Sequence, residues 1–156
     1  MDMAEDQTLL DTDLMEPTSE ILRRFYTEIW ENLQYDRIAE FFQPDLTSQT
    51  LIPERAVDPD EVKEWMKVLD ALVRDKKVTI LHSIDDGSWC SAFLKICCVS
   101  RATDKPVTAY QQILCRQKDG LLSESYPQFD LLRFFEQLDQ LPEDAYALLM
   151  SGTVLR

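Results

Sequence analysis

The sequence has little histidine, little glycine and no excess of basic residues, and each shortage argues against a class of function. His82 is the single histidine in 156 residues, and the four cysteines form no C-x-x-C pair, so a zinc site is not expected. Only three glycines are present, and none belongs to a phosphate-binding loop or a nucleophile elbow. We therefore expect neither a metal nor another cofactor.

The shortage of basic residues leaves a strongly acidic chain. Asp and Glu number 29 against 16 Lys and Arg, which gives a net charge of −13. Seven of the acids lie in the first 20 residues, which contain no Lys or Arg. An acidic chain without a basic stripe repels phosphate backbones, so no nucleic-acid partner is expected. We interpret residues 1–17 as a flexible acidic arm and residues 18–156 as one domain.

Long hydrophobic runs are also missing. No apolar run approaches the ~20 residues of a transmembrane helix, and the N-terminus has neither the basic nor the apolar region of a secretory signal. We therefore expect no membrane association and a cytoplasmic location. The apolar residues that are present make up 45% of the chain, which is enough for one packed core.

In the first half, apolar residues recur with helical spacing. One stripe comprises Ile21, Leu22, Phe25, Ile29, Trp30 and Leu33, and predicts a helix after Pro17. A short helix over 37–42 and a short strand over 46–52 follow. Asp58 is a good N-cap with Pro59 at the first helical position, and predicts a second long helix. The apolar face of that helix comprises Val62, Trp65, Met66, Leu69, Leu72 and Val73.

From residue 76 the apolar period changes from 3.6 to 2. Strands are predicted over 77–84, 89–101, 107–117 and 121–126, with D-G turns at 85–87 and 118–120. Two helices follow, one after Asp130 and one over 142–150. This order predicts an α+β domain in which a curved antiparallel sheet, a long four-stranded meander plus the short strand, wraps around the N-terminal helices. Such a cone leaves a pocket at one end.

Strand phase predicts which side chains face the helices. In the first meander strand Val78 and Ile80 are in phase with His82, and in the last strand Leu122 is in phase with Glu124 and Tyr126. We therefore expect these three polar residues to face inward. In the middle strands the expected inward set is Cys90, Ala92, Leu94, Ile96 and Cys98 with Val107, Ala109, Gln111, Ile113 and Cys115.

The opposite face of the middle strands then carries large apolar groups. These are Trp89, Phe93, Tyr110 and Leu114. So much aromatic surface on a free sheet predicts a subunit interface, most simply that of a two-fold homodimer. Periodicity alone also allows the two faces to be reversed.

The order of elements resembles the nuclear transport factor two-like superfamily, also called the SnoaL-like or cystatin-like α+β cone. Three segments over about residues 18–140 carry the resemblance: "RRFYTEIWENLQYDRIAEFFQPDL", "DEVKEWMKVLDAL" and "KDGLLSESYPQFDLLRFFEQL", with its D-x-L-x-x-x-x-Q-L helix. It implies a homodimer with a mostly apolar pocket in each cone and, in the enzymes, acid–base chemistry without a cofactor. The chain departs from the pattern by having Tyr126 where members often have Trp, and by lacking an acid just after it.

Glu124 and His82 are the candidate catalytic residues. A carboxyl on an apolar wall has a raised pKa that suits proton transfer, and His82 is the only imidazole. Glu124 is alternatively part of an ion pair or of a solvent-exposed strand end, and His82 alternatively has a structural role. On a flat sheet the two would lie ~14 Å apart, as walls of one cavity rather than as a dyad.

Tyr126, Tyr110, Gln111 and Asp130 are the candidate ligand-binding residues. The tyrosines are alternatively packing groups, and Asp130 is alternatively a helix cap. Two functions are compatible with these features. One is a small-molecule pocket protein that catalyses cofactor-free isomerisation, cyclisation or hydration of an apolar ligand. The other is a non-catalytic dimeric binding module, which a cone filled by Trp30, Trp65 and Phe side chains would favour.

Overall fold

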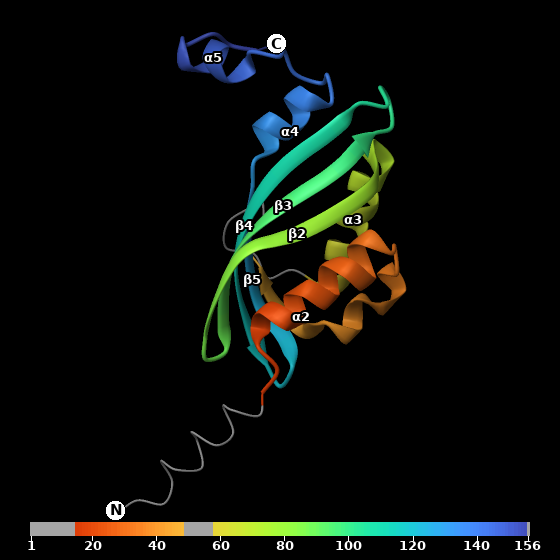
Figure 1. Ribbon diagram of the computed structural model, residues 1–156, viewed down its shortest axis with the longest axis vertical. Helices are drawn as coiled ribbons and strands as arrows, with labels where there is room; N and C mark the ends of the chain where they lie inside the picture. The colour runs from red at the N-terminus through yellow and green to blue at the C-terminus, as the bar shows by residue number, and fades with distance from the viewer. Residues whose placement is uncertain (1–14, 49–57, 156) are drawn as a thin grey trace, which may run out of the picture.

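The computed structural model describes residues 15–48 and 58–155 (Figure 1). Most of the expected acidic arm and residues 49–52 of the expected short strand lie outside this range. Within the described residues, no helix is both long and apolar enough to cross a membrane.

The fold is built on a curved five-stranded sheet with the order β1-β5-β4-β3-β2. β2 (Val73–Asp86), β3 (Trp89–Ser100), β4 (Pro106–Lys118) and β5 (Leu121–Phe129) form the predicted antiparallel meander. β1 (Phe42–Ser48) pairs with β5 in parallel, so the sheet is mixed rather than purely antiparallel. The α+β cone architecture is confirmed.

The D-G turn between β4 and β5 has the conformation that its sequence predicts. Asp119 and Gly120 both have positive φ, at 53° and 78°. This is the requirement of a two-residue turn whose twist matches that of its strands. Gly87 supplies a positive φ of 58° in the turn between β2 and β3.

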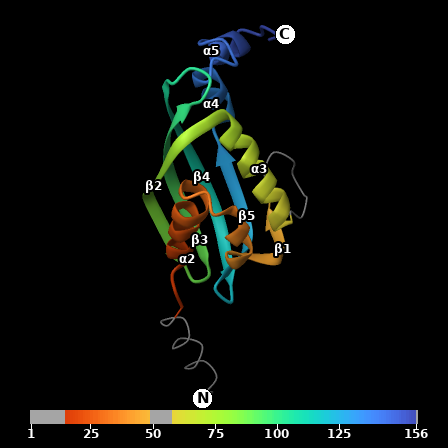
Figure 2. The same cartoon turned by 90° about the vertical axis from the view of Figure 1, so that its right-hand side faces the viewer.

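The N-terminal helices pack on one face of the sheet (Figures 1 and 2). α2 (Thr18–Arg24) continues into the π-helix η1 (Phe25–Glu31), the 3₁₀-helix η2 (Tyr35–Glu40) follows, and α3 (Pro59–Leu72) begins at its predicted cap. There the Asp58 carboxylate accepts a hydrogen bond from Asp60 N at 2.8 Å. The predicted stripe is correct except for Leu33, which lies beyond the helix at φ 59° and is 56% exposed.

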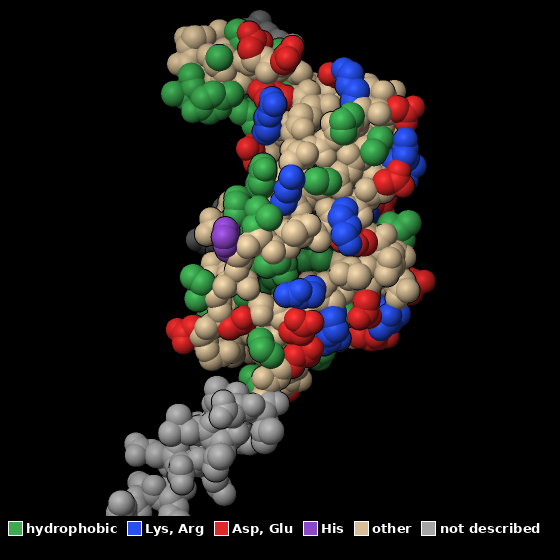
Figure 3. All heavy atoms as spheres, viewed as in Figure 1, with side chains coloured by type: hydrophobic (Ala, Val, Ile, Leu, Met, Phe, Trp, Pro, Cys, Tyr) green, Lys and Arg blue, Asp and Glu red, His purple; other side chains and the backbone are tan. Residues whose placement is uncertain are grey.

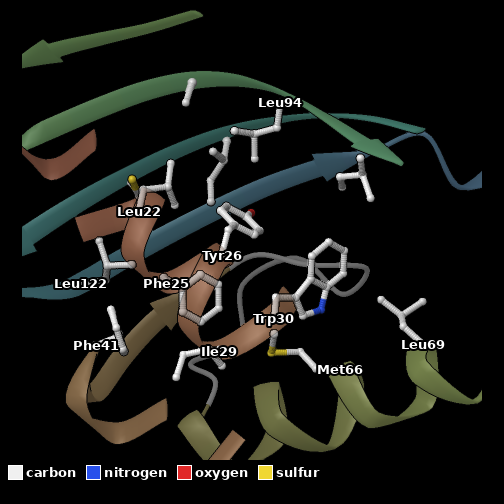
Figure 4. Packing of buried hydrophobic residues seen from close by; sticks show 14 of the residues in the cluster. Leu22, Phe25, Tyr26, Ile29, Trp30, Phe41, Met66, Leu69, Leu94 and Leu122 are labelled. Atoms are coloured by element: carbon white, nitrogen blue, oxygen red, sulfur yellow. The ribbon is translucent and has the colours of Figure 1, made fainter. Parts of the chain in front are cut away.

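The core forms between these helices and the concave face of the sheet. In Figure 4 the rings of Phe25, Tyr26 and Trp30 lie between the sheet and the side chains of Met66 and Leu69 from α3. The wider turn of the π-helix places four residues, Phe25, Tyr26, Ile29 and Trp30, in this core. Trp65, predicted to face inward, is 42% exposed.

In β3 and β4 the side chains predicted to face the helices are the buried ones. Cys90, Ala92, Leu94, Ile96 and Cys98 are buried, as are Val107, Ala109, Gln111, Ile113 and Cys115. Phe93, Tyr110 and Leu114 on the opposite face are 40–44% exposed. Periodicity therefore assigned the faces of these two strands correctly.

The strands that flank this pair contain extra residues. β2 contains one extra residue between Arg74 and Lys77 and another between Ile80 and His82, relative to β3. β5 contains one between Leu122 and Glu124, relative to β4. Each is a β-bulge, which bends the strand and increases its twist. The bulges help the sheet to curve around the helices, and each one also exchanges the two faces of its strand.

α4 (Leu131–Gln137) covers the part of β4 that extends beyond the end of β5. The Gln137 side chain donates to Thr108 O at 2.8 Å and accepts from Thr108 N at 2.9 Å. The amide thus occupies the place of a neighbouring strand and satisfies both backbone groups at an exposed edge. α5 (Ala145–Met150) follows and is held to α4 by a hydrogen bond from Tyr146 N to Glu136.

Candidate functional site

His82 lies on the outer face of the sheet and is exposed, contrary to the expected inward orientation. The imidazole is the purple side chain at the surface in Figure 3. The reason is the bulge after Ile80. Ile80 pairs with the buried Leu94, whereas His82 pairs with the outward-facing Phe93. Ile84 is turned outward by the same bulge and is 72% exposed.

Glu124 and Tyr126 also lie on the outer face, so their expected inward orientation is wrong. The bulge at Ser123 leaves Leu122 buried opposite Gln117 but places Glu124 opposite the exposed Arg116. Glu124 accepts a hydrogen bond from the Tyr126 hydroxyl at 2.7 Å and pairs with Arg116 at 3.2 Å. Its bond to the phenol raises the pKa of Tyr126. Glu124 is therefore an ion-paired surface carboxylate.

The remaining predicted residues are divided between the two faces. Gln111 faces the core, where its amide donates to the buried Tyr26 hydroxyl at 2.9 Å. Burial raises the pKa of Tyr26. Tyr110 lies outside, and Asp130 is the N-cap of α4, accepting from Arg133 N at 3.1 Å. The prediction of a helix cap is thus confirmed for Asp130.

Tyr110 and Asp130 meet at a surface hollow between α4 and β4. Arg133 and Gln137 line its other side. Its volume of about 220 Å³ is below the ~300–1,000 Å³ typical of small-molecule sites, and it opens to solvent. Within the described residues, no group of three or more His, Cys, Asp or Glu side chains is arranged to hold a metal ion.

Among the described residues, the void found inside the cone is very small, although a family pocket is expected there. Its volume is about 10 Å³, which is close to the least that holds one water molecule. The wall is mainly apolar and includes Trp30, Leu69, Ile96 and Phe134. A substrate-sized ligand does not fit this void in the conformation described.

One charged side chain also lines the void. The Lys76 side chain is only 2% exposed, although it carries an ammonium group. It forms an ion pair with Asp70, donates to the Tyr35 hydroxyl at 2.8 Å, and lies over the Trp30 ring at 5.1 Å from the centroid. Tyr35 also donates a hydrogen bond to Asp70. Three elements, η2, α3 and β2, therefore meet in one buried polar cluster.

Burial is the largest influence on the pKa values of Lys76 and Tyr35. Desolvation lowers the pKa of Lys76, and the bond and charge of Asp70 oppose that shift. Desolvation and the hydrogen bond to Asp70 raise the pKa of Tyr35. The sequence predictions did not include this cluster. The available signal was the position of Lys76, which is in phase with Val78 and Ile80 on the inward face.

The outer face carries the aromatic surface that the sequence predicts. Phe93 and Tyr110 stack with 5.6 Å between ring centroids and 10° between planes. The Arg116 guanidinium lies 5.3 Å from the centroid of the Trp89 ring. Leu114 and Ile84 add exposed apolar surface beside them. This surface, which we call the outer patch, comprises Ile84, Trp89, Phe93, Tyr110 and Leu114.

The fold is an α+β cone that resembles those of SnoaL-like proteins, and its outer face carries the apolar outer patch. No family model matches the sequence, and no curated protein matches it. Its structural neighbours are SnoaL-like and ketosteroid isomerase-like proteins of the nuclear transport factor two-like superfamily.

Three solved structures illustrate the similarity. A proposed polyketide cyclase from Acidithiobacillus ferrooxidans is 20% identical over 81% of this chain and 97% of its own, with a TM-score of 0.70. A proposed SnoaL-like polyketide cyclase from Jannaschia sp. is 17% identical over 80% and 92%, with a TM-score of 0.68. A protein of ketosteroid isomerase-like fold from Catenulispora acidiphila, in complex with trimethylamine, is 16% identical over 80% and 95%, with a TM-score of 0.66. At these identities the likeness concerns the fold alone.

Proposed function

We propose that this chain is a non-catalytic, homodimeric binding module built on the SnoaL-like cone. The observation that carries the proposal is the small void inside the cone, which measures about 10 Å³ among the described residues. The two predicted catalytic residues, Glu124 and His82, lie outside the cone. The groups that the acid–base hypothesis requires therefore do not meet at an apolar cavity.

The outer patch supports the choice of a second copy as the partner. Aromatic residues and arginine are the residue types that contribute most to binding at protein interfaces. The patch provides a stacked pair, Phe93 and Tyr110, and a Trp89–Arg116 pair on one sheet face. A two-fold axis would bring the outer patches of two copies together, so that each apolar group of one copy meets apolar groups of the other.

Sedimentation equilibrium of the wild-type chain and two glutamate variants tests the dimer. We expect twice the monomer mass for wild type and for Val68→Glu, which changes an exposed apolar residue on α3 (64% exposed). Phe93→Glu places a charge in the outer patch and should weaken association at least 100-fold. A monomeric wild type at about 100 μM, or equal weakening by both variants, would contradict the proposal.

A second candidate is the small-molecule function, and the cluster of Lys76, Asp70 and Tyr35 favours it. Lys76 lines the void, and Asp70 and Tyr35 are bonded to Lys76. In an opened cone these groups would supply a base and a hydrogen-bond donor for isomerisation, cyclisation or hydration of an apolar ligand. A fragment screen that follows Trp30 fluorescence and NMR shifts of core methyl groups would test this. Saturable shifts at Ile96 would support the second candidate, and their absence across the screen would count against it.

A further inference from the structure

The Lys76 ammonium occupies a site with the chemistry of an ammonium receptor. Nζ lies over the Trp30 ring at 5.1 Å from its centroid, within the ~6 Å range of cation–π attraction. The Asp70 carboxylate pairs with the same atom, and the Tyr35 hydroxyl lies 2.8 Å from it. One ring face, one carboxylate and one hydroxyl thus converge on a single cation.

Three features show that the site is built independently of the side chain that fills it. Trp30, Tyr35 and Asp70 come from η1, η2 and α3, whereas Lys76 comes from β2. The Tyr35–Asp70 hydrogen bond fixes two of the walls without Lys76. Lys76 forms none of these walls and enters from the sheet, where it is in phase with Val78 and Ile80 on the inward face of β2.

The site also has a route to solvent and a space behind it. The Asp70 side chain is 19% exposed and Tyr35 is partly exposed, so the carboxylate side reaches the surface. The Lys76 stem lines the apolar void inside the cone. A small alkylammonium ion in place of this side chain would set its charge beside Asp70 and its carbon chain against Trp30.

We propose that Trp30, Tyr35 and Asp70 form an ammonium-binding cage, in which Lys76 is the built-in occupant. The cage accepts primary alkylammonium ions when Lys76 is removed, and Lys76 excludes them from the wild-type protein. The inference concerns the interior of one protomer and does not depend on the dimer.

Chemical rescue of Lys76→Ala tests the cage. n-Propylammonium has the same heavy atoms as the deleted part of lysine, from Cγ to Nζ, and propan-1-ol is its uncharged counterpart. We expect Lys76→Ala to melt below wild type, and n-propylammonium at ten times its Kd to raise the Tm of the variant by about 3–6 °C. Wild type and Lys76→Met, in which the site is filled, should show no such saturable rise.

The comparison of the charged amine with the uncharged alcohol decides whether the cage binds ammonium ions. Propan-1-ol should not raise the Tm of Lys76→Ala, and the double variant Lys76→Ala/Asp70→Asn should lose the response to n-propylammonium. Equal effects of the amine and the alcohol, a response that survives Asp70→Asn, or no response at all would overturn the proposal. If Lys76→Ala does not fold, refolding is measured with each additive. Recovery with the amine alone supports the cage, and recovery with neither or with both overturns it.

Discussion

Asp70→Asn is the substitution that most directly tests how the interior of this protein is held together. It keeps the size of the side chain and removes the only charge that pairs with the Lys76 ammonium in the structure described. Lys76 has a 2% exposed side chain, and Asp70 has a 19% exposed one. Removing one partner of a buried ion pair costs about 3–5 kcal/mol, and the partial exposure of Asp70 places the expected loss near 3 kcal/mol.

The pH dependence of stability gives a second, independent readout. Burial lowers the pKa of Lys76 below its ordinary 10.5, and Asp70 opposes this shift. Asp70→Asn should therefore lower the pKa of Lys76 further. At pH values between the lowered pKa of Lys76 in the folded protein and its ordinary pKa in the unfolded chain, Lys76 carries a proton in the unfolded chain but not in the folded one. The free energy of unfolding therefore rises with pH in this range. We expect the rise between pH 7 and 10 to be steeper in Asp70→Asn than in wild type, by at most ~1.4 kcal/mol per pH unit.

Urea unfolding followed by tryptophan fluorescence measures both effects. Asp75→Asn is the matched control, because Asp75 pairs with Arg74 at the surface, where its side chain is 66% exposed, and its positive φ suits asparagine. The control should lose less than about 1 kcal/mol. Adding Lys76→Met to Asp70→Asn should abolish the extra pH slope. A loss in Asp70→Asn no larger than in the control, or a slope that persists without Lys76, would refute a coupled buried pair.

Other substitutions test the edges and bulges of the sheet. Glu124→Gln should cost less than about 1 kcal/mol in urea unfolding, because the carboxylate is a partly exposed ion pair; a loss above 3 kcal/mol would contradict its surface role. Gln137→Ala should lower the free energy of unfolding by about 1–3 kcal/mol, because two hydrogen bonds to the Thr108 backbone are lost. Hydrogen exchange at Thr108 N should accelerate, and unchanged exchange would contradict a role of Gln137 in covering this edge of the sheet. Deletion of Ser123 should be tolerated, because it removes the extra residue of the bulge and leaves Leu122 inward and Glu124 outward. Deletion of Tyr126 should unfold the protein, because it shifts a regularly paired part of β5 by one residue and turns its side chains to the opposite face of the sheet. Circular dichroism compares the two variants, and equal outcomes would contradict the bulge.

Local sequence signals predicted much of the fold. The cap at Asp58 and the turn at Asp119–Gly120 depend on residues a few positions apart, and both have the predicted geometry. The faces of β3 and β4 followed from simple alternation, because these strands pair without a register shift along their whole length. The exposed Phe93–Tyr110 surface was predicted for the same reason.

The faces of His82 and Glu124 were predicted wrongly, because they depend on one extra residue in β2 and one in β5. Alternation assumes an uninterrupted strand, and a bulge after Ile80 or at Ser123 reverses the face of every residue between it and the strand end. His82 and Glu124 were therefore assigned to the wrong face.

The sequence by itself determined the order and type of most helices and strands, since periodicity and turn chemistry act over a few residues, but β1 begins at Phe42 rather than at the predicted residue 46. Only the tertiary structure decided where β2 and β5 bulge, because the bend a strand needs depends on the helices that it must wrap. Tertiary packing also brought Lys76, on the inward face of β2, together with Trp30, Tyr35 and Asp70, three residues from three other elements. Their meeting is a property of the packed cone, and no local pattern in the chain encodes it.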